Sequence, residues 1–310
     1  HSLFGNITDE VINLLRSQSY ILILDEVMNV VERLDIYDND KLNDAQKDIM
    51  SKEDINTLMG KGILEVDEET KLVSWNSDTN VLYKYTKIKN LADRNLLYYL
   101  DGDLLIWTFP IEVFRDNLFD EIFILTYQFK YQIQAYYYDY FGLDYDMYMV
   151  IDSDNRNYKL IPENPQLELD WRRSIKSIVN VCDNDKLNKI GNSYIDSAGT
   201  SRSTTLSKTW FDTATPEVFG VLKKNIANYY SNITKSKSKQ RMWTSFKSHK
   251  KDFKDAYIPA KSWIELNCRA SNEYADKSIL VYPINRYLNP FYFRFFDLKG
   301  IKLDQDMYAL

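Results

Sequence analysis

The sequence predicts an α/β protein in which parallel β-strands alternate with helices. Short apolar runs of strand length are separated by amphipathic stretches of helical length. The clearest series is 104–107, 111–117 and 121–126, which we expect to fold as strand, helix and strand. Units of this length imply parallel strands joined by right-handed crossovers.

The other elements of the first half follow from apolar periodicity and from capping residues. Thr8 and Ser51 are expected to cap two helices, and the acidic residues 35–52 are expected to form an exposed connection. In chain order we expect a helix at 8–18, a strand at 20–24, a helix at 27–34, a helix at 51–59, a hairpin of 63–66 and 71–75, a helix at 132–141 and a strand at 145–151.

The polar residues 152–164 are the best linker candidate, so the 310 residues are expected to form two domains, 1–155 and 156–310. The helix and hairpin within about 35–80 have the composition of an insertion into the first domain. In the second domain we expect a helix at 171–182, a Ser/Thr-rich loop at 197–207, a basic helix at 216–230, a strand at 263–267 and a helix at 278–288 that ends before Asn289-Pro290.

Composition argues against several classes of protein. No apolar stretch approaches the roughly 20 residues that span a bilayer, and no signal peptide is visible. The only cysteines are Cys182 and Cys268 and the only histidines His1 and His249, which excludes a disulfide framework and argues against a Cys/His zinc cluster. A cytoplasmic location fits these counts. The chain begins without Met, so we expect a fragment or a processed product.

The sequence Leu22-Ile23-Leu24-Asp25-Glu26 is the strongest functional signal. An apolar run that stops at two carboxylates is typical of a buried parallel strand that delivers acids to the carboxyl edge of a sheet. In nucleotide-driven motors the first acid positions Mg²⁺ and the second orients water. The alternative is a strand capped by solvated acids.

Three further residues suit contacts with a nucleotide. Thr108 ends the strand 104–107, where helicase cores carry a coupling element. Arg269, in the polar stretch 267–274, can donate to a phosphate. Arg286, on the helix expected at 278–288, has the place of an arginine finger. The alternatives are an ordinary strand end, a polar turn, and a surface Arg paired with an acid.

A basic segment with interleaved aromatic residues predicts contact with nucleic acid. The net charge is −6, yet residues 223–261 hold 11 Lys and Arg against two Asp, a local balance of +9. Lys and Arg neutralise phosphates, and aromatic rings stack on unpaired bases. A solvated basic face is the alternative, and His249 is interpreted as a surface residue. The expected contacts are Lys235, Lys237, Lys239, Arg241, Trp243, Phe246, Lys247, Lys250 and Lys251.

Other patterns have simpler interpretations. The Tyr136-Tyr137-Tyr138 run and Tyr140 have the spacing of core aromatic residues on a helix, with base stacking as the alternative. No G-x-x-x-x-G-K-[ST] phosphate loop is present, and only 24 residues precede Asp25. The loop therefore lies upstream in a longer parent, or the protein is not an NTPase.

Several stretches together resemble phage-encoded helicases of the DEAD/DEAH-like class. The resemblance is to a divergent branch similar to viral origin-of-replication-binding proteins, which carries an R-A-T-N-x-Y element followed by V-N-R. The stretches are His1-Ser2-Leu3-Phe4, Leu22-Ile23-Leu24-Asp25-Glu26, Leu105-Ile106-Trp107-Thr108-Phe109-Pro110, Asn267-Cys268-Arg269-Ala270-Ser271-Asn272-Glu273-Tyr274 and Ile284-Asn285-Arg286-Tyr287-Leu288-Asn289-Pro290.

The resemblance implies two RecA-like lobes, the first incomplete at its N-terminus, with Mg-ATP between them and a nucleic-acid strand across them. Asp25 would match the Mg²⁺-organising acid and Glu26 the water-orienting acid. Thr108 would match the coupling element. Arg286 would match the arginine of the second lobe, with Arg269 as the second choice. Two features depart from the pattern: Val27-Met28 follows the acid pair, and the last glycine-arginine motif is missing.

The sequence therefore predicts the distal part of an ATP-dependent helicase or translocase of phage DNA replication, acting on DNA in the host cytoplasm with other replication proteins. The rival is a non-catalytic, helicase-like scaffold that recognises DNA or a replication partner. A third class, a metal-dependent nuclease, would use the acids around 144–154, but the usual accompanying Lys or His is absent there.

Overall fold

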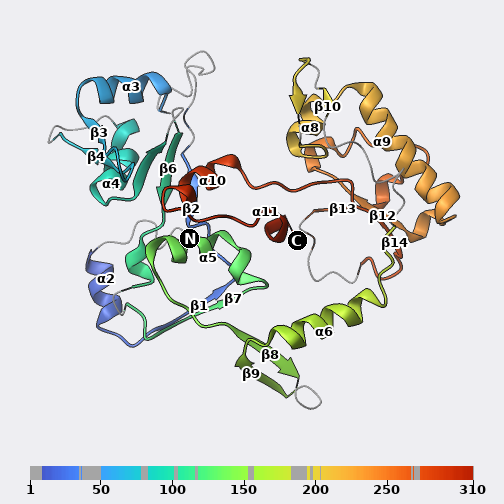
Figure 1. Ribbon diagram of the computed structural model, residues 1–310, viewed down its shortest axis with the longest axis horizontal. Coiled ribbons are helices and arrows are strands. Elements are labelled where there is room, and N and C mark those ends of the chain that lie inside the picture. Colours follow the sequence, from blue (N-terminus) through green and yellow to red (C-terminus); the bar gives the residue numbers. More distant parts are fainter. Residues whose placement is uncertain are drawn as a thin grey trace. The chain divides into compact units, whose positions relative to one another are not determined.

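A computed structural model describes residues 9–34, 36, 50–77, 83–100, 104–115, 118–152, 157–182, 194–195, 198–202, 204–266, 268 and 273–309 (Figure 1). The chain divides into two compact units. The first comprises His1–Met147 and Leu288–Tyr308, and the second Tyr148–Tyr287. Among the described helices, none combines the length and apolarity needed to cross a membrane.

A pair of parallel strands forms one part of the first unit. Helix α2 (Asp9–Arg16) leads into β1 (Ile21–Asp25), which pairs in parallel with β7 (Glu121–Leu125). Ile21 lies opposite Glu121, and Asp25 lies opposite Leu125. The strands expected at 20–24 and 121–126 are confirmed, and they form a parallel pair with each other.

The segment between these strands forms a second, antiparallel sheet in the order β2-β6-β5. Its strands are β2 (Val31–Arg33), β6 (Leu104–Thr108) and β5 (Leu97–Leu100). The helix expected at 27–34 is therefore wrong, and the strand at 104–107 pairs with neither β1 nor β7. Val30 and Val31 are fully buried, and their β-branched side chains fit a sheet better than a short helix, which is marginal without tertiary packing.

The antiparallel sheet separates two hydrophobic cores. Leu97 and Leu105 belong to one core, whereas their neighbours Tyr98 and Ile106 belong to the other. Successive side chains of a strand point to opposite faces. This explains why β5 and β6 are apolar without alternation, because both faces of the sheet are covered.

One of these cores belongs to a helix and hairpin that the sequence predicts. Helix α3 (Lys52–Gly60) is capped by Ser51, and β3 (Leu64–Val66) pairs with β4 (Val73–Trp75) in an antiparallel hairpin. Both elements are confirmed. The 3₁₀ turn η3 (Tyr83–Tyr85) and helix α4 (Thr86–Asp93) complete this part of the unit.

The other core is built around aromatic helices. In α5 (Ile133–Phe141), Tyr136, Tyr137, Tyr138 and Tyr140 are all buried, which confirms their interpretation as core residues. Helix α10 (Pro290–Asp297) packs against α5, with Phe295 stacked 4.7 Å from Tyr140 between ring centroids. Two 3₁₀ turns, η4 (Ile111–Val113) and η5 (Phe129–Tyr131), lie in the same unit, and η4 lies where the helix expected at 111–117 would begin.

The C-terminal segment differs from its expected place. A helix was expected to end before Asn289-Pro290, but α10 begins there, with Asn289 as its N-cap and Pro290 in its first turn. Proline has no main-chain N–H to donate, and the N–H groups of a helix's first turn have no partner within the helix. Pro290 therefore favours a helix start over a helix end. Because α10 carries buried Phe295 and Phe296 into the core around α5, residues from Leu288 belong with the first unit rather than with 156–310. Helix α11 (Gln305–Ala309) follows.

The second unit begins where a linker was expected. Strands β8 (Tyr148–Asp152) and β9 (Tyr158–Pro162) form an antiparallel hairpin, so the linker at 152–164 is wrong. Helix α6 (Pro165–Lys176) starts at its Asn164 cap, earlier than the 171–182 expected. A short pair, β10 (Tyr194–Ile195) and β11 (Ser201–Arg202), follows.

A parallel sheet in the order β13-β12-β14 forms the centre of the second unit. Its strands are β13 (Trp263–Ile264), β12 (Arg241–Thr244) and β14 (Ile279–Val281). The helix expected at 278–288 is therefore wrong, because 279–281 form β14 and 282–288 are irregular. The pairing of Leu280 with Met242 satisfies main-chain groups that a helix would otherwise bond internally.

Helices α8 (Lys208–Thr213) and α9 (Pro216–Asn228) share a core with this sheet. Trp210, Leu222, Trp243 and Phe253 meet in it. The basic helix expected at 216–230 is confirmed, and it continues into a π-helical turn. The turns of this region are η6 (Tyr229–Ile233), η7 (Ser238–Gln240), η8 (Lys247–His249) and η9 (Ala260–Ser262).

Candidate functional site

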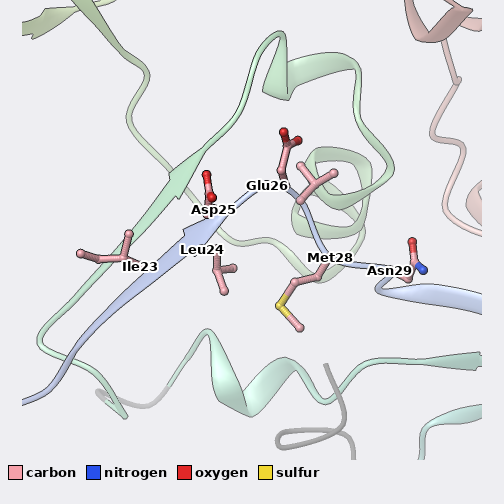
Figure 2. A pocket seen from close by; sticks show the side chains of 7 residues that line it. Ile23, Leu24, Asp25, Glu26, Met28 and Asn29 are labelled. Atoms are coloured by element: carbon pink, nitrogen blue, oxygen red, sulfur yellow. The ribbon is translucent and has the colours of Figure 1, made fainter. Parts of the chain in front are cut away.

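The acid pair lies at the carboxyl end of β1, as expected for a functional edge of a parallel sheet. Figure 2 shows the carboxylates of Asp25 and Glu26 extending to one side of the strand end, while Leu24 and Met28 extend to the other. The pocket here has a volume of about 340 Å³ and is lined by Ile23, Leu24, Asp25, Glu26, Val27, Met28 and Asn29.

The strand that carries the acids is less buried than the sequence indicates. Ile21 and Ile23 are 56% and 62% exposed, whereas the alternate residues Leu22 and Leu24 are half-buried. The expectation of a fully buried strand is wrong, because among the described residues only one face of β1 is covered. An uninterrupted apolar run is typical of a strand covered on both faces.

Thr126 completes the edge, and the sequence analysis missed it. The Glu26 amide donates to the Leu125 carbonyl at 3.1 Å, which extends the parallel ladder past β1. Thr126, the next residue along β7, directs its hydroxyl to the Glu26 carboxylate, with Oγ1 3.5 Å from Oε2. A signal was available, because residues that follow two paired parallel strands lie at the same edge.

Thr108 does not lie at this edge. It ends β6 in the antiparallel sheet, opposite Val31. Its side chain is fully buried, and its Oγ1 has no hydrogen-bond partner within the described part of the chain. A buried hydroxyl cannot contact a nucleotide that binds from solvent, so the structure contradicts the role expected of Thr108.

Glu26 has an unusual main-chain conformation. Its φ is +103°, in a region that side chains with a Cβ rarely adopt. Such a conformation costs about 1–3 kcal/mol and persists only when the surroundings impose it. The carboxylate therefore projects from a strained turn, a feature that clusters at functional sites.

The two carboxylates supply oxygen donors, which suit Mg²⁺. Across the described ranges, no group of three or more His, Cys, Asp or Glu side chains lies close enough to hold a metal by itself. This donor set fits an ion that takes one or two protein carboxylates and completes its shell with water and phosphate oxygens. Asp25, the metal ligand expected from the sequence, is exposed at the end of β1.

Of the two arginines expected in the second lobe, the structure describes Arg286. Arg286 is exposed and belongs to the second unit, in an irregular segment after β14 rather than on a helix. The main-chain N–H of its neighbour Asn285 donates a hydrogen bond to the Leu206 carbonyl at 3.0 Å. Arg269 lies outside the described residues.

The basic segment splits into exposed and structural residues. Lys235, Lys237, Lys239, Lys247 and Lys251 are exposed. Lys247 also pairs with Glu265 at 3.3 Å. These five residues are the exposed lysines.

Two other residues of the segment hold the fold together. Trp243 is only 2% exposed and donates from Nε1 to the Pro259 carbonyl at 2.9 Å, so base stacking by Trp243 is contradicted. Arg241 donates to the Ser236 and Tyr257 carbonyls and lies 5.0 Å over the Tyr230 ring.

Lys250 also belongs to the fold. Its ammonium lies 3.9 Å from the centre of the Trp263 ring, a cation–π contact. Lys250 and Arg241, both expected to bind phosphate, therefore have packing contacts within the fold. Phe246 is half-buried and packs against Phe211, with ring centroids 5.5 Å apart.

His249 connects two segments through its ring nitrogens and is not a surface residue. Its side chain is 13% exposed, and its ring nitrogens lie 2.8 Å from Asp212 on α8 and 2.8 Å from Asp252. Hydrogen bonds from Lys208, and then from His249, lower the pKa of Asp212. Because carboxylates occupy both ring nitrogens, His249 is not placed to act as a base.

Comparisons with known proteins match both halves of the chain. Residues 46–107 match the YonV middle domain, and residues 173–310 match the YonV C-terminal Rossmann-like domain. The first range covers the helix and hairpin, and the second contains the parallel β13-β12-β14 sheet, so the protein is an α/β protein with a Rossmann-like domain.

A relative matches the whole chain. It is the "SPbeta prophage-derived uncharacterized protein YonV" of Bacillus subtilis (strain 168), which is 35% identical over 316 residues, covering 100% of this chain and 70% of the relative. No solved structure gives a significant match. Because similarity extends along the whole chain and over most of the relative, the chain belongs to the YonV family.

Proposed function

We propose that this protein is part of an ATP-dependent nucleic-acid translocase or helicase, with the carboxyl edge of β1 and β7 as its metal-organising side. The observation that carries the proposal is the meeting of Asp25, Glu26 and Thr126 at the end of two parallel strands. Ligands of parallel α/β sheets bind outside the carboxyl ends of the strands. Two RecA-like lobes, with Arg286 and Arg269 in the second, are part of this proposal.

Each residue of the edge has a role that its position allows. Asp25 would hold Mg²⁺ through a carboxylate oxygen. Glu26 would accept a hydrogen bond from the attacking water and orient it. Thr126 would donate to Glu26 and limit the directions in which that carboxylate can turn. ATP with its bound Mg²⁺ would supply the phosphoryl group that the water attacks.

The exposed lysines support a nucleic-acid partner, most simply DNA. They cluster in a part of the chain with a local balance of +9 although the chain as a whole carries −6. Phosphate contacts of this kind supply most non-specific affinity for nucleic acid. With Trp243 buried, the proposed contact is electrostatic rather than one of base stacking.

The relative's prophage-derived name supports a phage setting. On this basis we propose action in the host cytoplasm during phage DNA replication, with other replication proteins as partners.

Turnover of ATP by the full-length protein tests this proposal. Glu26→Gln should abolish nucleic-acid-stimulated hydrolysis while ATP binding is retained, and Asp25→Asn should weaken Mg²⁺ dependence as well. The matched control is Glu121→Gln, which removes an exposed carboxylate at the opposite end of the same strand pair. Unchanged turnover in Glu26→Gln would remove this residue from the mechanism.

A non-catalytic scaffold remains the second candidate, because these 310 residues contain no phosphate loop. It predicts that the full-length protein binds nucleic acid but neither binds nor hydrolyses ATP. Equilibrium binding of ATP to the full-length protein separates the two candidates.

A further inference from the structure

Gln134 is a fully buried amide in α5, a helix rich in aromatic residues. Both ends of the amide have partners. Its Oε1 accepts a hydrogen bond from the Met28 main-chain amide at 2.8 Å. Its Nε2 donates to the Tyr138 hydroxyl at 3.1 Å, one helical turn away on the same helix. A main-chain N–H can only donate, so this pairing determines which way the amide faces.

The bond to Met28 reaches the turn that carries the acid pair. Met28 lies two residues beyond Glu26, whose φ is +103°. On the strand side, the turn is held by the ladder bond from the Glu26 amide to the Leu125 carbonyl at 3.1 Å. On the other side, Gln134 holds Met28, and the Val30 carbonyl accepts from the Phe109 amide at 2.8 Å. The unusual conformation of Glu26 lies between these anchors.

Packing alone does not specify this turn. Val27 and Met28 contact the core around α5 as partly buried side chains, and apolar contacts are not directional. A hydrogen bond from a buried amide is directional and is expensive to leave unmade. It is therefore the contact that can hold the main chain at one position.

We propose that Gln134 is a positioning residue, which holds the turn after β1 and thereby sets where the Glu26 carboxylate lies. The structural part stands on these contacts alone. Its consequence for hydrolysis rests on the proposed function. Nothing in the sequence pattern marks Gln134, because it occupies one position in a helix of core residues.

Hydrogen exchange tests the structural part without any activity. Gln134→Met has a similar length and removes the acceptor. We expect the Met28 amide to exchange at least tenfold faster in this variant, while the amides of β12 in the second unit are unchanged. The matched control is Tyr136→Phe, which removes a hydroxyl of α5 that accepts from a different main-chain amide, that of Asp304 at 3.0 Å. In this control the Met28 amide should keep its exchange rate.

Tyr138→Phe provides a milder test, since it removes only the hydroxyl that orients the amide. It should accelerate exchange at Met28 by a smaller factor than Gln134→Met does, and it serves as the main test if Gln134→Met fails to fold. Exchange at Met28 that is unaltered in a folded Gln134→Met or, failing that, in Tyr138→Phe would overturn the proposal.

Steady-state kinetics of the full-length protein test the consequence. Gln134→Met should lower kcat for ATP and leave KM nearly unchanged, because it displaces Glu26 without touching a nucleotide-binding group. If exchange at Met28 rises while no variant or wild type hydrolyses ATP, the proposed function fails and the positioning role stands. If exchange is unaltered while Glu26→Gln still abolishes turnover, the positioning role fails and the proposed function stands.

Discussion

The Thr126 hydroxyl lies 3.5 Å from the Glu26 carboxylate, although the two residues are 100 positions apart in the chain. Parallel pairing of β1 with β7 brings them to one edge. The distance is long for a hydrogen bond, and such contacts often shorten when a substrate or metal binds.

Thr126 should influence turnover through its hydroxyl. We expect Thr126→Val in the full-length protein to lower kcat about tenfold, because a hydrogen bond to a charged group contributes about 1.5 kcal/mol. Thr126→Ser keeps the hydroxyl and should retain most activity. ATP turnover with saturating nucleic acid measures the effect, and equal kcat values for the Val and Ser variants would contradict it.

Glu26 should be a site where glycine stabilises the protein. Glycine adopts positive φ readily, so Glu26→Gly relieves the strain. The greater flexibility of glycine in the unfolded chain offsets part of this gain, and the free energy of unfolding should rise by about 1 kcal/mol. Glu26→Ala is the control, since it removes the carboxylate and keeps the Cβ that causes the strain. Urea unfolding measures both. A glycine variant no more stable than the alanine variant would show that the turn is unstrained.

Asp54 should stabilise the helix-and-hairpin part through its charge. Its carboxylate accepts from the Ser51 main chain, from Lys84 at 2.7 Å and from Tyr85 at 2.8 Å. Burial alone would raise the pKa of Asp54, but the bonds from Lys84, Ser51 and Tyr85 together lower it. We expect Asp54→Ala to reduce the free energy of unfolding by about 2 kcal/mol at neutral pH.

The effect of Asp54 should depend on pH in one direction. A carboxyl whose pKa is lower in the folded state stabilises the protein above its unfolded pKa and loses that stabilisation as pH falls through the folded one. The ordinary value is 3.8. The difference between wild type and Asp54→Ala should therefore be full at pH 6 to 7 and shrink below about pH 4. A difference that stays constant down to about pH 2 would contradict this assignment.

The exposed lysines should carry the salt dependence of nucleic-acid binding. Changing Lys235, Lys237, Lys239 and Lys251 to Gln should weaken binding and reduce the slope of log affinity against log salt by up to about 0.9 for each phosphate that is no longer neutralised. Trp243→Phe should leave that slope unchanged, because the ring is buried. Fluorescence anisotropy with labelled DNA at several salt concentrations measures the slopes. Four Gln substitutions with the wild-type slope would place the contact surface elsewhere.

Buried tyrosines should limit stability at high pH. Burial raises the pKa of Tyr98, Tyr137 and Tyr138 above the ordinary value of 10.0 and raises the pKa of Tyr292 to about 12. The unfolded chain releases these protons first, so stability should be complete below about pH 10 and fall as pH rises above it. Tyr137→Phe should reduce this fall in stability. Unfolding free energies at successive alkaline pH values provide the measurement.

Local signals in the sequence predicted several elements correctly. Ser51 with Asp54 three residues later marks a helix start whose bonds lie within one turn, and the hairpin of β3 and β4 is equally local. The apolar runs at 20–24 and 121–126 also predicted two strands, although not their pairing with each other. In each case a few neighbouring residues contain the information.

The wrong predictions concern segments whose partners lie far away in the chain. Val31 joins a sheet because Thr108 lies opposite it, and Leu280 does so because Met242 lies opposite it. Apolar residues at helical spacing describe both segments, since propensity is a weak prior that tertiary pairing overrides. The basic-aromatic pattern likewise could not distinguish Trp243, in the core, from the lysines at the surface.

The sequence by itself determined the α/β class, the acids at the end of β1, the capped helix α3 and the excess of positive charge in residues 223–261. These are properties of neighbouring residues. Only the tertiary structure decided that Thr126 rather than Thr108 lies beside Glu26, and that Gln134 bonds the turn that follows. The reason is physical: strand pairing and a buried hydrogen bond join residues about a hundred positions apart, and no local pattern records which distant partner a side chain will meet.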